Sequence, residues 1–157
     1  MLKKIPNIIS PELMATLMRM GHGDEIVLAD GNFPAASIAE NTPGGLVRAD
    51  GHGVPELLKA ILEFFPLDNY VGYAESPVML MKVVEGNESV PSGGPHIWDR
   101  FRQIIGASDE VVANFNDFQR IERFAFYERA RKAFAVVATS ETALYANIIL
   151  KKGVVTG

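Results

Sequence analysis

The feature that most constrains the fold is a short, continuously apolar run that begins at Glu25 and ends at Ala29. Five residues are too few for an amphipathic helix, and an uninterrupted apolar run lacks the alternation of a strand with one face in water. A strand that is covered on both faces has this pattern. The run therefore predicts a buried strand that places Asp30 at its carboxyl end, and Gly31 to Pro34 predict a loop after it.

Helical and strand patterns alternate along the rest of the chain. Ser10 and Pro11 have the residue types of an N-cap and a first helical position, so a helix is predicted from Pro11 until Gly21 stops it. Further helices are expected at 54–65, 96–105 and 120–133. Further strands are expected at 46–49, 78–84, 111–113, 134–138 and 147–150, and the last two are close enough in sequence to be antiparallel.

This alternation predicts an α/β fold. We expect a single domain over residues 1–157, with three layers (α/β/α) and a mixed, mainly parallel sheet of about six strands. A length of 157 residues, 48% of them hydrophobic, suits one domain with a sizeable core. Ligands of open α/β sheets usually bind beyond the carboxyl ends of strands, which favours the loops that follow Asp30 and Asp50.

Composition excludes several classes of function. With 15 basic and 19 acidic residues and a net charge of -4, the chain lacks the electrostatic footprint of a protein that binds nucleic acid or an anionic membrane. The absence of cysteine excludes disulfides and thiolate nucleophiles. No signal peptide is visible and no apolar run approaches the roughly 20 residues of a membrane helix, so a cytoplasmic protein is expected. There is no Gly-x-Gly-x-x-Gly, Walker loop or Gly-x-Ser-x-Gly elbow, and no cofactor is predicted.

A histidine between two glycines, His22, is the first candidate for chemistry. An unperturbed imidazole changes its charge near neutral pH, so it can both give and take a proton, and Asp24 is close enough in sequence to orient it. The alternative is a capping or core histidine that hydrogen-bonds nearby backbone. His52 repeats the glycine-flanked pattern and His96 follows a loop rich in Gly, Ser and Pro. Without a His-x-x-x-His pair, these histidines predict no metal site.

Polar residues in the last third of the chain are the second group of candidates. Arg123, Tyr127, Tyr145 and Asn147 offer donors and acceptors that suit a polyhydroxylated ligand. The alternative is structural: Arg123 and Tyr127 lie one helical turn apart and can form a solvated or interface face, and Asp30 can cap the turn after its strand. The residues alone leave both interpretations open.

Several separate blocks carry a resemblance to a known family. In chain order they are Ile9–Leu13, Met20–Glu25, Arg48–Gly51, Arg123–Ala130 and Tyr145–Gly153. Together they resemble the ribose pyranase/fucose mutarotase family, and its fucose branch in particular, over residues 5–154. The chain departs from the usual pattern in a longer loop at 86–95 and in the Gly-His-Gly at 51–53.

The resemblance implies an isomerase that interconverts the α and β anomers of a reducing sugar without a cofactor, with pyranose and furanose forms of D-ribose as a further substrate. Arg123 matches a position that is histidine in the ribose branch, which favours L-fucose. By similarity His22 is the general acid/base, and the substrate-binding residues are Asp30, Arg123, Tyr145, Ala146 and Asn147, with Ala146 acting through its backbone. Ring-shaped homo-oligomers with sites near subunit boundaries are also implied. The alternatives are a non-catalytic sugar-binding or regulatory protein that uses the same pocket, and an unrelated small-molecule isomerase.

Overall fold

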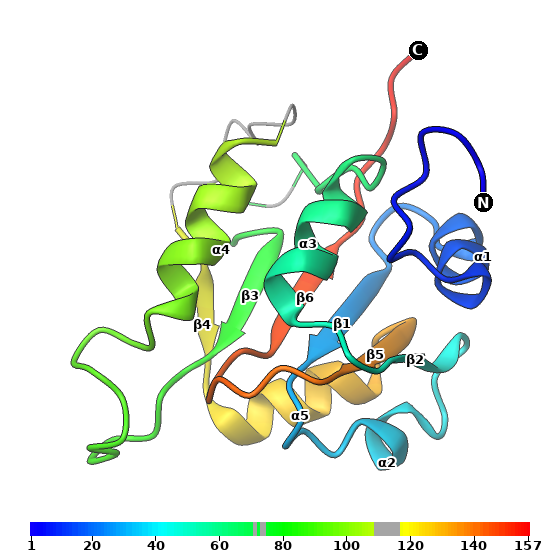
Figure 1. Ribbon diagram of the computed structural model, residues 1–157. Coiled ribbons are helices and arrows are strands. Elements are labelled where there is room, and N and C mark those ends of the chain that lie inside the picture. The colour runs from blue at the N-terminus through cyan, green and yellow to red at the C-terminus, as the bar shows by residue number, and fades with distance from the viewer. Residues whose placement is uncertain (71, 73–74, 109–116) are drawn as a thin grey trace.

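The computed structural model describes residues 1–70, 72, 75–108 and 117–157. These residues form one six-stranded sheet with the strand order β2-β5-β1-β6-β3-β4 (Figure 1). The strands are β1 (Glu25–Ala29), β2 (Gly45–Ala49), β3 (Val78–Met81), β4 (Gln119–Ile121), β5 (Ala135–Thr139) and β6 (Ile148–Lys151). The helices are α1 (Pro11–Arg19), α2 (Ala35–Ala39), α3 (Val54–Leu62), α4 (Ile97–Gly106) and α5 (Arg123–Arg131). Within the described part of the chain, no helix is long and apolar enough to cross a membrane.

The sheet is mixed and mainly parallel, as the sequence predicts. β5 pairs in parallel with both β1 and β2, and β3 pairs in parallel with β4. β6 lies between β1 and β3 and is antiparallel to both. Consequently β5 and β6 run in opposite directions, as expected, but they are not neighbours because β1 lies between them.

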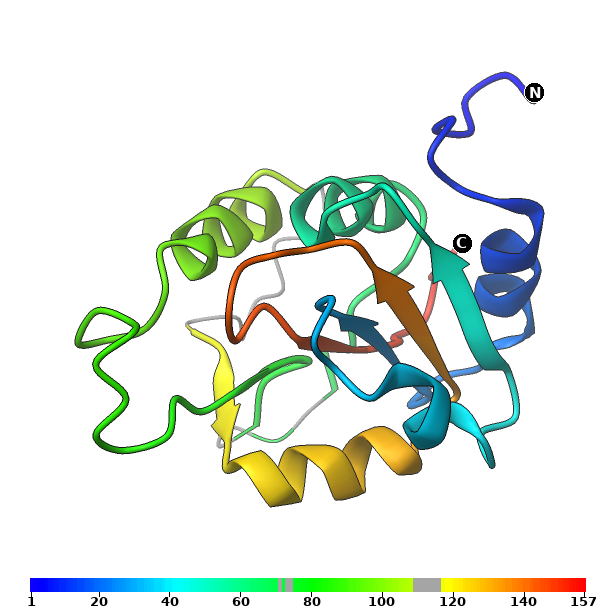
Figure 2. The same ribbon diagram turned by 60° about the horizontal axis from the view of Figure 1, so that its bottom comes forward.

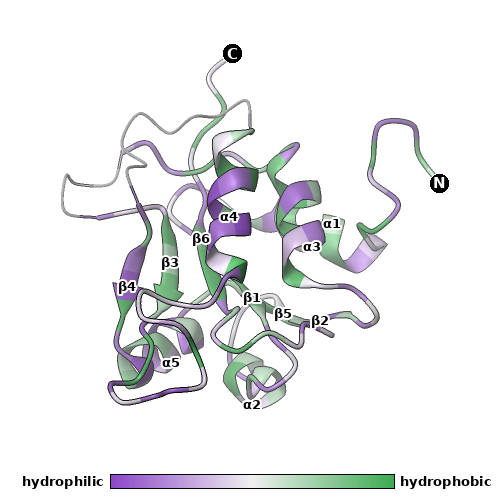
Figure 3. Cartoon of the chain, turned by 60° about the vertical axis from the view of Figure 1, so that its left-hand side comes forward, coloured by the Kyte–Doolittle hydropathy of each residue, from purple (hydrophilic) through white to green (hydrophobic). Residues whose placement is uncertain are grey.

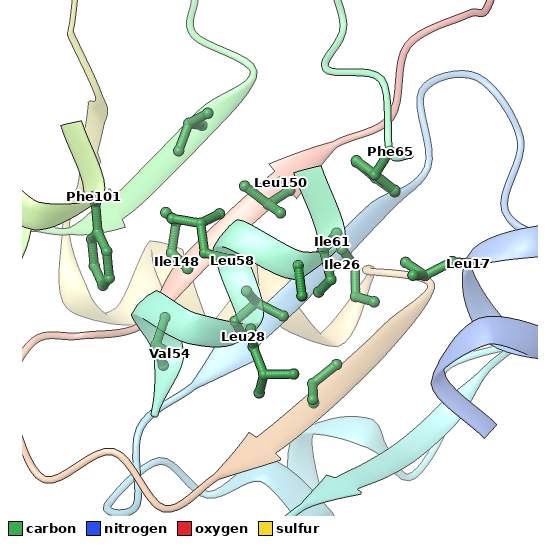
Figure 4. Packing of buried hydrophobic residues seen from close by; sticks show 14 of the residues in the cluster. Leu17, Ile26, Leu28, Val54, Leu58, Ile61, Phe65, Phe101, Ile148 and Leu150 are labelled. Carbon is green, nitrogen blue, oxygen red and sulfur yellow. The ribbon is translucent and has the colours of Figure 1, made fainter. Parts of the chain in front are cut away.

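Helices cover both faces of the sheet and complete the three expected layers (Figure 2). Side chains of β1 alternate between two apolar clusters: Ile26 and Leu28 pack with α1, α3 and α4, whereas Val27 and Ala29 pack with α2 and α5. Figure 4 shows the first of these clusters, in which α3 lies over β1 and β6. Because these four β1 residues are fully buried, β1 is the doubly covered strand that its apolar run predicts.

The main departure from the sequence-based expectation is the region 119–133. A helix was expected from Arg120, but Gln119–Ile121 forms the edge strand β4 against β3. Glu122 then caps α5, because its carboxylate accepts hydrogen bonds from the first free N–H groups of the helix. Figure 3 shows why the pattern misleads: β3 and β6 are hydrophobic, while β4 is largely hydrophilic and lacks a strand signature.

Smaller differences concern the ends of elements. The helix expected at 54–65 ends at Leu62, and the strand expected at 78–84 ends at Met81. The short helix α2 was not expected, because it has five residues and no side-chain cap. The strand expected at 111–113 lies outside the described residues. In contrast, α1 begins as predicted, and the Ser10 hydroxyl accepts a hydrogen bond from the Leu13 N–H at 3.1 Å.

Candidate active site

A polar cavity of about 260 Å³ lies at the carboxyl ends of β1 and β3. Asp30 immediately follows β1, Met81 ends β3, and the segment that enters β6 contributes Tyr145 and Asn147. This segment reaches the same edge of the sheet because β6 is antiparallel to its neighbours. Loops and α5 supply the remaining lining residues: Asn32, Phe33, Asn87, Arg123, Tyr127 and Leu144. The cavity therefore occupies the usual ligand-binding position of an α/β sheet.

Asp30 and Asn147 form the buried base of the cavity. The Asp30 N–H donates to Asn147 Oδ1 at 2.8 Å, and Asn147 Nδ2 donates back to Asp30 Oδ2 at 3.0 Å. Asn32 N–H donates to the other carboxylate oxygen at 3.0 Å. Only 5% of Asp30 is exposed, and burial raises its pKa, although hydrogen bonds from Asn32, Ala146, Phe33 and Asn147 oppose the shift. The result is an oriented carboxylate that can accept hydrogen bonds from ligand hydroxyl groups.

Tyr145 is held at the wall of the cavity by its backbone as well as its side chain. Its φ of 56° is in the left-handed region, which is uncommon for a non-glycine residue. The Trp98 indole N–H donates to the Tyr145 carbonyl oxygen at 2.8 Å. Ala146, the next residue, is fully buried, and its backbone makes a hydrogen bond to the Asp30 carboxyl group.

Arg123 and Tyr127 lie one turn apart on α5 and face the cavity together. The Arg123 guanidinium lies 5.8 Å from the Tyr127 ring centroid, and hydrogen bonding to the Tyr127 side chain is the main cause of its raised pKa. The Tyr127 ring in turn packs at 5.5 Å from the Phe33 ring. The guanidinium is therefore a cationic donor that lines the same cavity as the buried carboxylate of Asp30.

His22 lies at the opposite end of β1 from this cavity. His22 precedes the first residue of β1, Glu25, whereas Asp30 follows the last residue, Ala29. The five-residue strand that separates His22 from Asp30 is about 16 Å long. The His22 Nε2 lies 3.1 Å from Asp68 Oδ1, and 47% of the His22 side chain is exposed. One copy of the chain therefore brings the other predicted site residues together but keeps the imidazole apart from them.

The partner of His22 is Asp68, which the sequence did not single out. Only 4% of its side chain is exposed, its Oδ1 accepts a hydrogen bond from the Tyr70 N–H at 2.9 Å, and its Oδ2 lies 4.0 Å from Lys151 Nζ. The available signal was weak: an acidic residue directly after the apolar segment 64–67. The pairing depends on a bridge between Leu67 and Lys152, which joins residues far apart in sequence.

The remaining acid/base candidates have structural partners. The Asp24 carboxylate accepts a hydrogen bond from the Gly21 N–H at 2.7 Å and so closes the turn, and it is Asp68 whose carboxylate contacts His22. His52 Nδ1 lies 3.2 Å from Glu56 Oε1, one turn further along α3 and away from the cavity lining. Within the described ranges, no three His, Asp or Glu side chains gather in a group that could hold a metal ion.

The comparison with known proteins assigns the chain to a family. Residues 3–155 match the RbsD / FucU transport protein family. The chain belongs to the RbsD/FucU family. It is 52% identical over 153 residues to the fucose mutarotase of Homo sapiens, covering 98% of this chain and 94% of the relative. It is 48% identical over 154 residues to the fucose mutarotase of Danio rerio, again covering 98% and 94%.

Solved RbsD/FucU structures agree with this assignment. The fucose mutarotase of Streptococcus pneumoniae, crystallised with L-fucose, is 51% identical with a TM-score of 0.84 and covers 99% of this chain and 100% of its own. RbsD of Bacillus subtilis shares the fold at 17% identity, with a TM-score of 0.69 over 99% and 100% of the two chains. Within the RbsD/FucU family the chain therefore groups with the fucose mutarotases.

Proposed function

We propose that this chain interconverts the α and β anomers of L-fucose. The observation that carries the proposal is the convergence of Asp30, Arg123, Tyr145 and Asn147 in one cavity, although nearly 120 positions separate the first from the last. An anionic acceptor, a cationic donor and neutral groups around one small cavity suit a polyhydroxylated ligand. Relatives that are about half identical over nearly the whole chain are fucose mutarotases.

The reaction needs only proton transfers. A base removes the proton of the anomeric hydroxyl group, the bond between C1 and the ring oxygen breaks, and an acid protonates the ring oxygen. Rotation about the bond between C1 and C2 of the open aldehyde, followed by the reverse transfers, closes the ring as the other anomer. The sugar is neither oxidised nor reduced in this sequence.

We assign the proton transfer to His22 and the binding of the sugar to the cavity. His22 is half exposed and contacts a buried carboxylate, which favours a fixed orientation of the imidazole. Asp30 and Asn147 would hold sugar hydroxyl groups, Arg123 and Tyr145 would donate to sugar oxygens, and Ala146 would act through its backbone. Asp68 would act as a positioning residue for the imidazole.

His22 and the cavity lie at opposite ends of β1, so we propose that two copies of the chain share each site. The imidazole of one copy would enter the cavity of a neighbour, and repetition of this heterologous contact closes a ring. The half-exposed side chain of His22 is available for such a contact. A ring-shaped homo-oligomer with its sites at subunit boundaries is therefore part of the proposal, as is a cytoplasmic location, which cell fractionation tests.

Exchange NMR on equilibrated L-fucose tests the activity. Saturation of the α-anomeric proton should transfer to the β signal much faster with the protein than in buffer alone, and D-ribose and D-galactose measured in parallel define the preference for L-fucose. Folded protein that leaves the exchange at the rate of buffer alone contradicts the proposal. If the protein binds the sugar but does not accelerate exchange, the second candidate, a non-catalytic sugar-binding protein, is favoured. The observation that supports this candidate is that His22 lies apart from the cavity in one copy of the chain.

A further inference from the structure

The connection between β3 and α4 carries a residue that the proposed mechanism has not used. Asn87 lies in this loop, is half-buried and lines the cavity. Its Nδ2 donates to the Tyr145 hydroxyl oxygen at 2.9 Å, and the Val84 N–H lies 3.4 Å from the same oxygen. The loop therefore contacts the proposed sugar site through one phenol group.

The hydrogen bonds around Asn87 fix which end of its amide faces the phenol. The Ser89 N–H donates to Asn87 Oδ1 at 3.0 Å, so this oxygen is already an acceptor on the side of the loop. The Nδ2 group is then left to face Tyr145, and it can only donate. The backbone N–H of Asn87 also donates to the Val84 carbonyl oxygen at 3.1 Å. This bond keeps Asn87 Nδ2 and the Val84 N–H, the two donors near the Tyr145 hydroxyl, on one tight turn.

The loop is also anchored beyond this turn. Gly94 packs so closely on Trp98 that a Cβ at Gly94 would lie 2.2 Å from the indole ring. The same indole holds the Tyr145 carbonyl oxygen through its N–H. Tyr145 is thus fixed at its carbonyl and at its hydroxyl by two parts of the 82–98 region, which leaves the phenol little freedom to turn.

A phenol has one proton to donate and two lone pairs to accept with. The Asn87 Nδ2–H group occupies one lone pair at a good distance, and the longer contact from the Val84 N–H approaches the other. The neighbouring Arg123 guanidinium has donors only, so it cannot accept the phenol proton. The hydroxyl proton is then available to donate to a ligand oxygen in the cavity.

We propose that Asn87 is a positioning residue that makes Tyr145 a hydrogen-bond donor to the bound sugar. This inference rests on the proposed sugar site, and it concerns the loop at 86–95. It extends the specificity of the cavity to a residue outside the blocks that carry the family resemblance.

Asn87→Asp is the decisive variant, because it keeps the shape of the side chain and replaces the amide donor by an acceptor. The carboxylate is expected to accept the Tyr145 proton and to turn it away from the sugar. The Kd for L-fucose, measured by calorimetric titration of the full-length protein, should rise about tenfold, the effect of one lost hydrogen bond with a buried partner. Asn87→Ala, which removes the donor without adding an acceptor, should weaken binding less. Anomer exchange at saturating sugar should stay within about twofold for both variants.

Two controls separate this role from an effect of charge or of loop stability. Ser89→Asp adds the same charge on the same exposed turn and keeps the backbone N–H that binds Asn87, so its Kd should match that of the native chain. In a Tyr145→Phe background, Asn87→Asp should cause no further loss of affinity, because the proton that it redirects is absent.

The inference is overturned if Asn87→Asp binds as the native chain does, if Ser89→Asp weakens binding equally, or if the loss persists in the Tyr145→Phe background. These outcomes leave the proposed function standing when the native chain still accelerates anomer exchange. Conversely, a native chain that binds L-fucose without exchange contradicts the mutarotase function, while the differences in Kd still decide the role of Asn87.

Discussion

The two ends of β1 carry two different kinds of polar chemistry. At its amino end, His22 is half exposed and contacts a buried carboxylate, Asp68. At its carboxyl end, Asp30 lies at the base of a cavity and is surrounded by hydrogen-bond donors. The first end offers a half-exposed imidazole, and the second offers a shaped binding site.

This difference teaches that binding and proton transfer are built separately in one copy of the chain. The cavity residues are fixed by neighbours within the same copy, as the reciprocal hydrogen bonds between Asp30 and Asn147 show. His22 is oriented by Asp68 but is not among the residues that line the cavity. Variants at the two ends should therefore have different effects, and their combination should show whether the ends of different copies cooperate.

The largest effect is expected from mixing two inactive variants. His22→Ala and Asp30→Asn should each lower anomer exchange by about 100-fold or more, because one removes the acid/base and the other the carboxylate. Co-expression of the two should restore about a quarter of the native exchange, since random pairing in a symmetric ring joins an intact His22 to an intact cavity in that share of sites. The measurement is exchange NMR on L-fucose.

The control for mixing is His22→Ala co-expressed with the double variant His22→Ala/Asp30→Asn, which supplies no imidazole and should stay inactive. If the first mixture is no more active than its two components, the two ends of β1 do not meet between copies. Sharing of the site would then be wrong, whatever the oligomeric state proves to be.

Asp68→Asn should lower the exchange rate by about tenfold and leave the Kd for L-fucose within about twofold. It keeps the shape of the group that contacts His22 and removes the charge that stabilises and orients a protonated imidazole. Asp24→Asn is the matched control, because the Asp24 carboxylate lies in the same turn as His22 but accepts a hydrogen bond from the Gly21 N–H instead of contacting the imidazole. A change in Kd larger than the change in rate would show that this end of β1 binds the sugar directly.

Arg123→Lys should have the opposite signature, with a Kd for L-fucose several-fold to about tenfold higher. A lysine keeps the charge but lacks the planar fork of donors that the guanidinium presents beside Tyr127. Arg131→Lys, on the same helix but paired with Glu128, should bind L-fucose as the native chain does. Calorimetric titration makes the comparison, and equal affinities for all three proteins would remove Arg123 from the binding site.

The smallest effect concerns the dependence of stability on pH. Burial raises the pKa of Asp30 above its ordinary value of 3.8, so the folded chain keeps this proton to a higher pH than the unfolded chain does. Relative to Asp30→Asn, the native chain should be most stable below that value and should lose stability as the pH rises through the folded pKa. One proton limits this slope to about 1.4 kcal/mol per pH unit.

Urea unfolding of both proteins between pH 4 and 7 measures this difference. The comparison isolates Asp30, because the other titrating groups are common to both chains. A difference in the free energy of unfolding that is flat, or that increases with pH, would contradict the role of burial at the cavity end of β1.

The sequence predicted the elements whose patterns are local. The apolar run of β1 and the Ser10 cap of α1 are examples, and both are confirmed. It failed at Gln119–Ile121, whose pairing with β3 depends on a partner 40 residues away and outweighs the helical appearance of the segment. The family resemblance and the isomerase class that follows from it are likewise confirmed.

Most residues of the candidate site were named from the sequence, but their arrangement in space was not. The family resemblance implies Asp30, Arg123 and Asn147 as candidate binding residues, and the fold brings them into one cavity. The resemblance implies His22 as well, but no local pattern reveals that it lies at the other end of β1. Asp68 and Asn87 were missed because each contacts a candidate site residue more than 40 positions away.

The reversed direction of β6 has a consequence for how this molecule can change. Asn147 enters the strand at the cavity, and Lys151 ends it near Asp68, with Glu25 opposite Lys151 and Leu28 opposite Ile148 in one continuous register. A slip of one residue along β1 would turn every β6 side chain to the other face and displace both polar regions at once. An insertion or deletion within this one strand is therefore expected to disturb the binding cavity and the His22 region together.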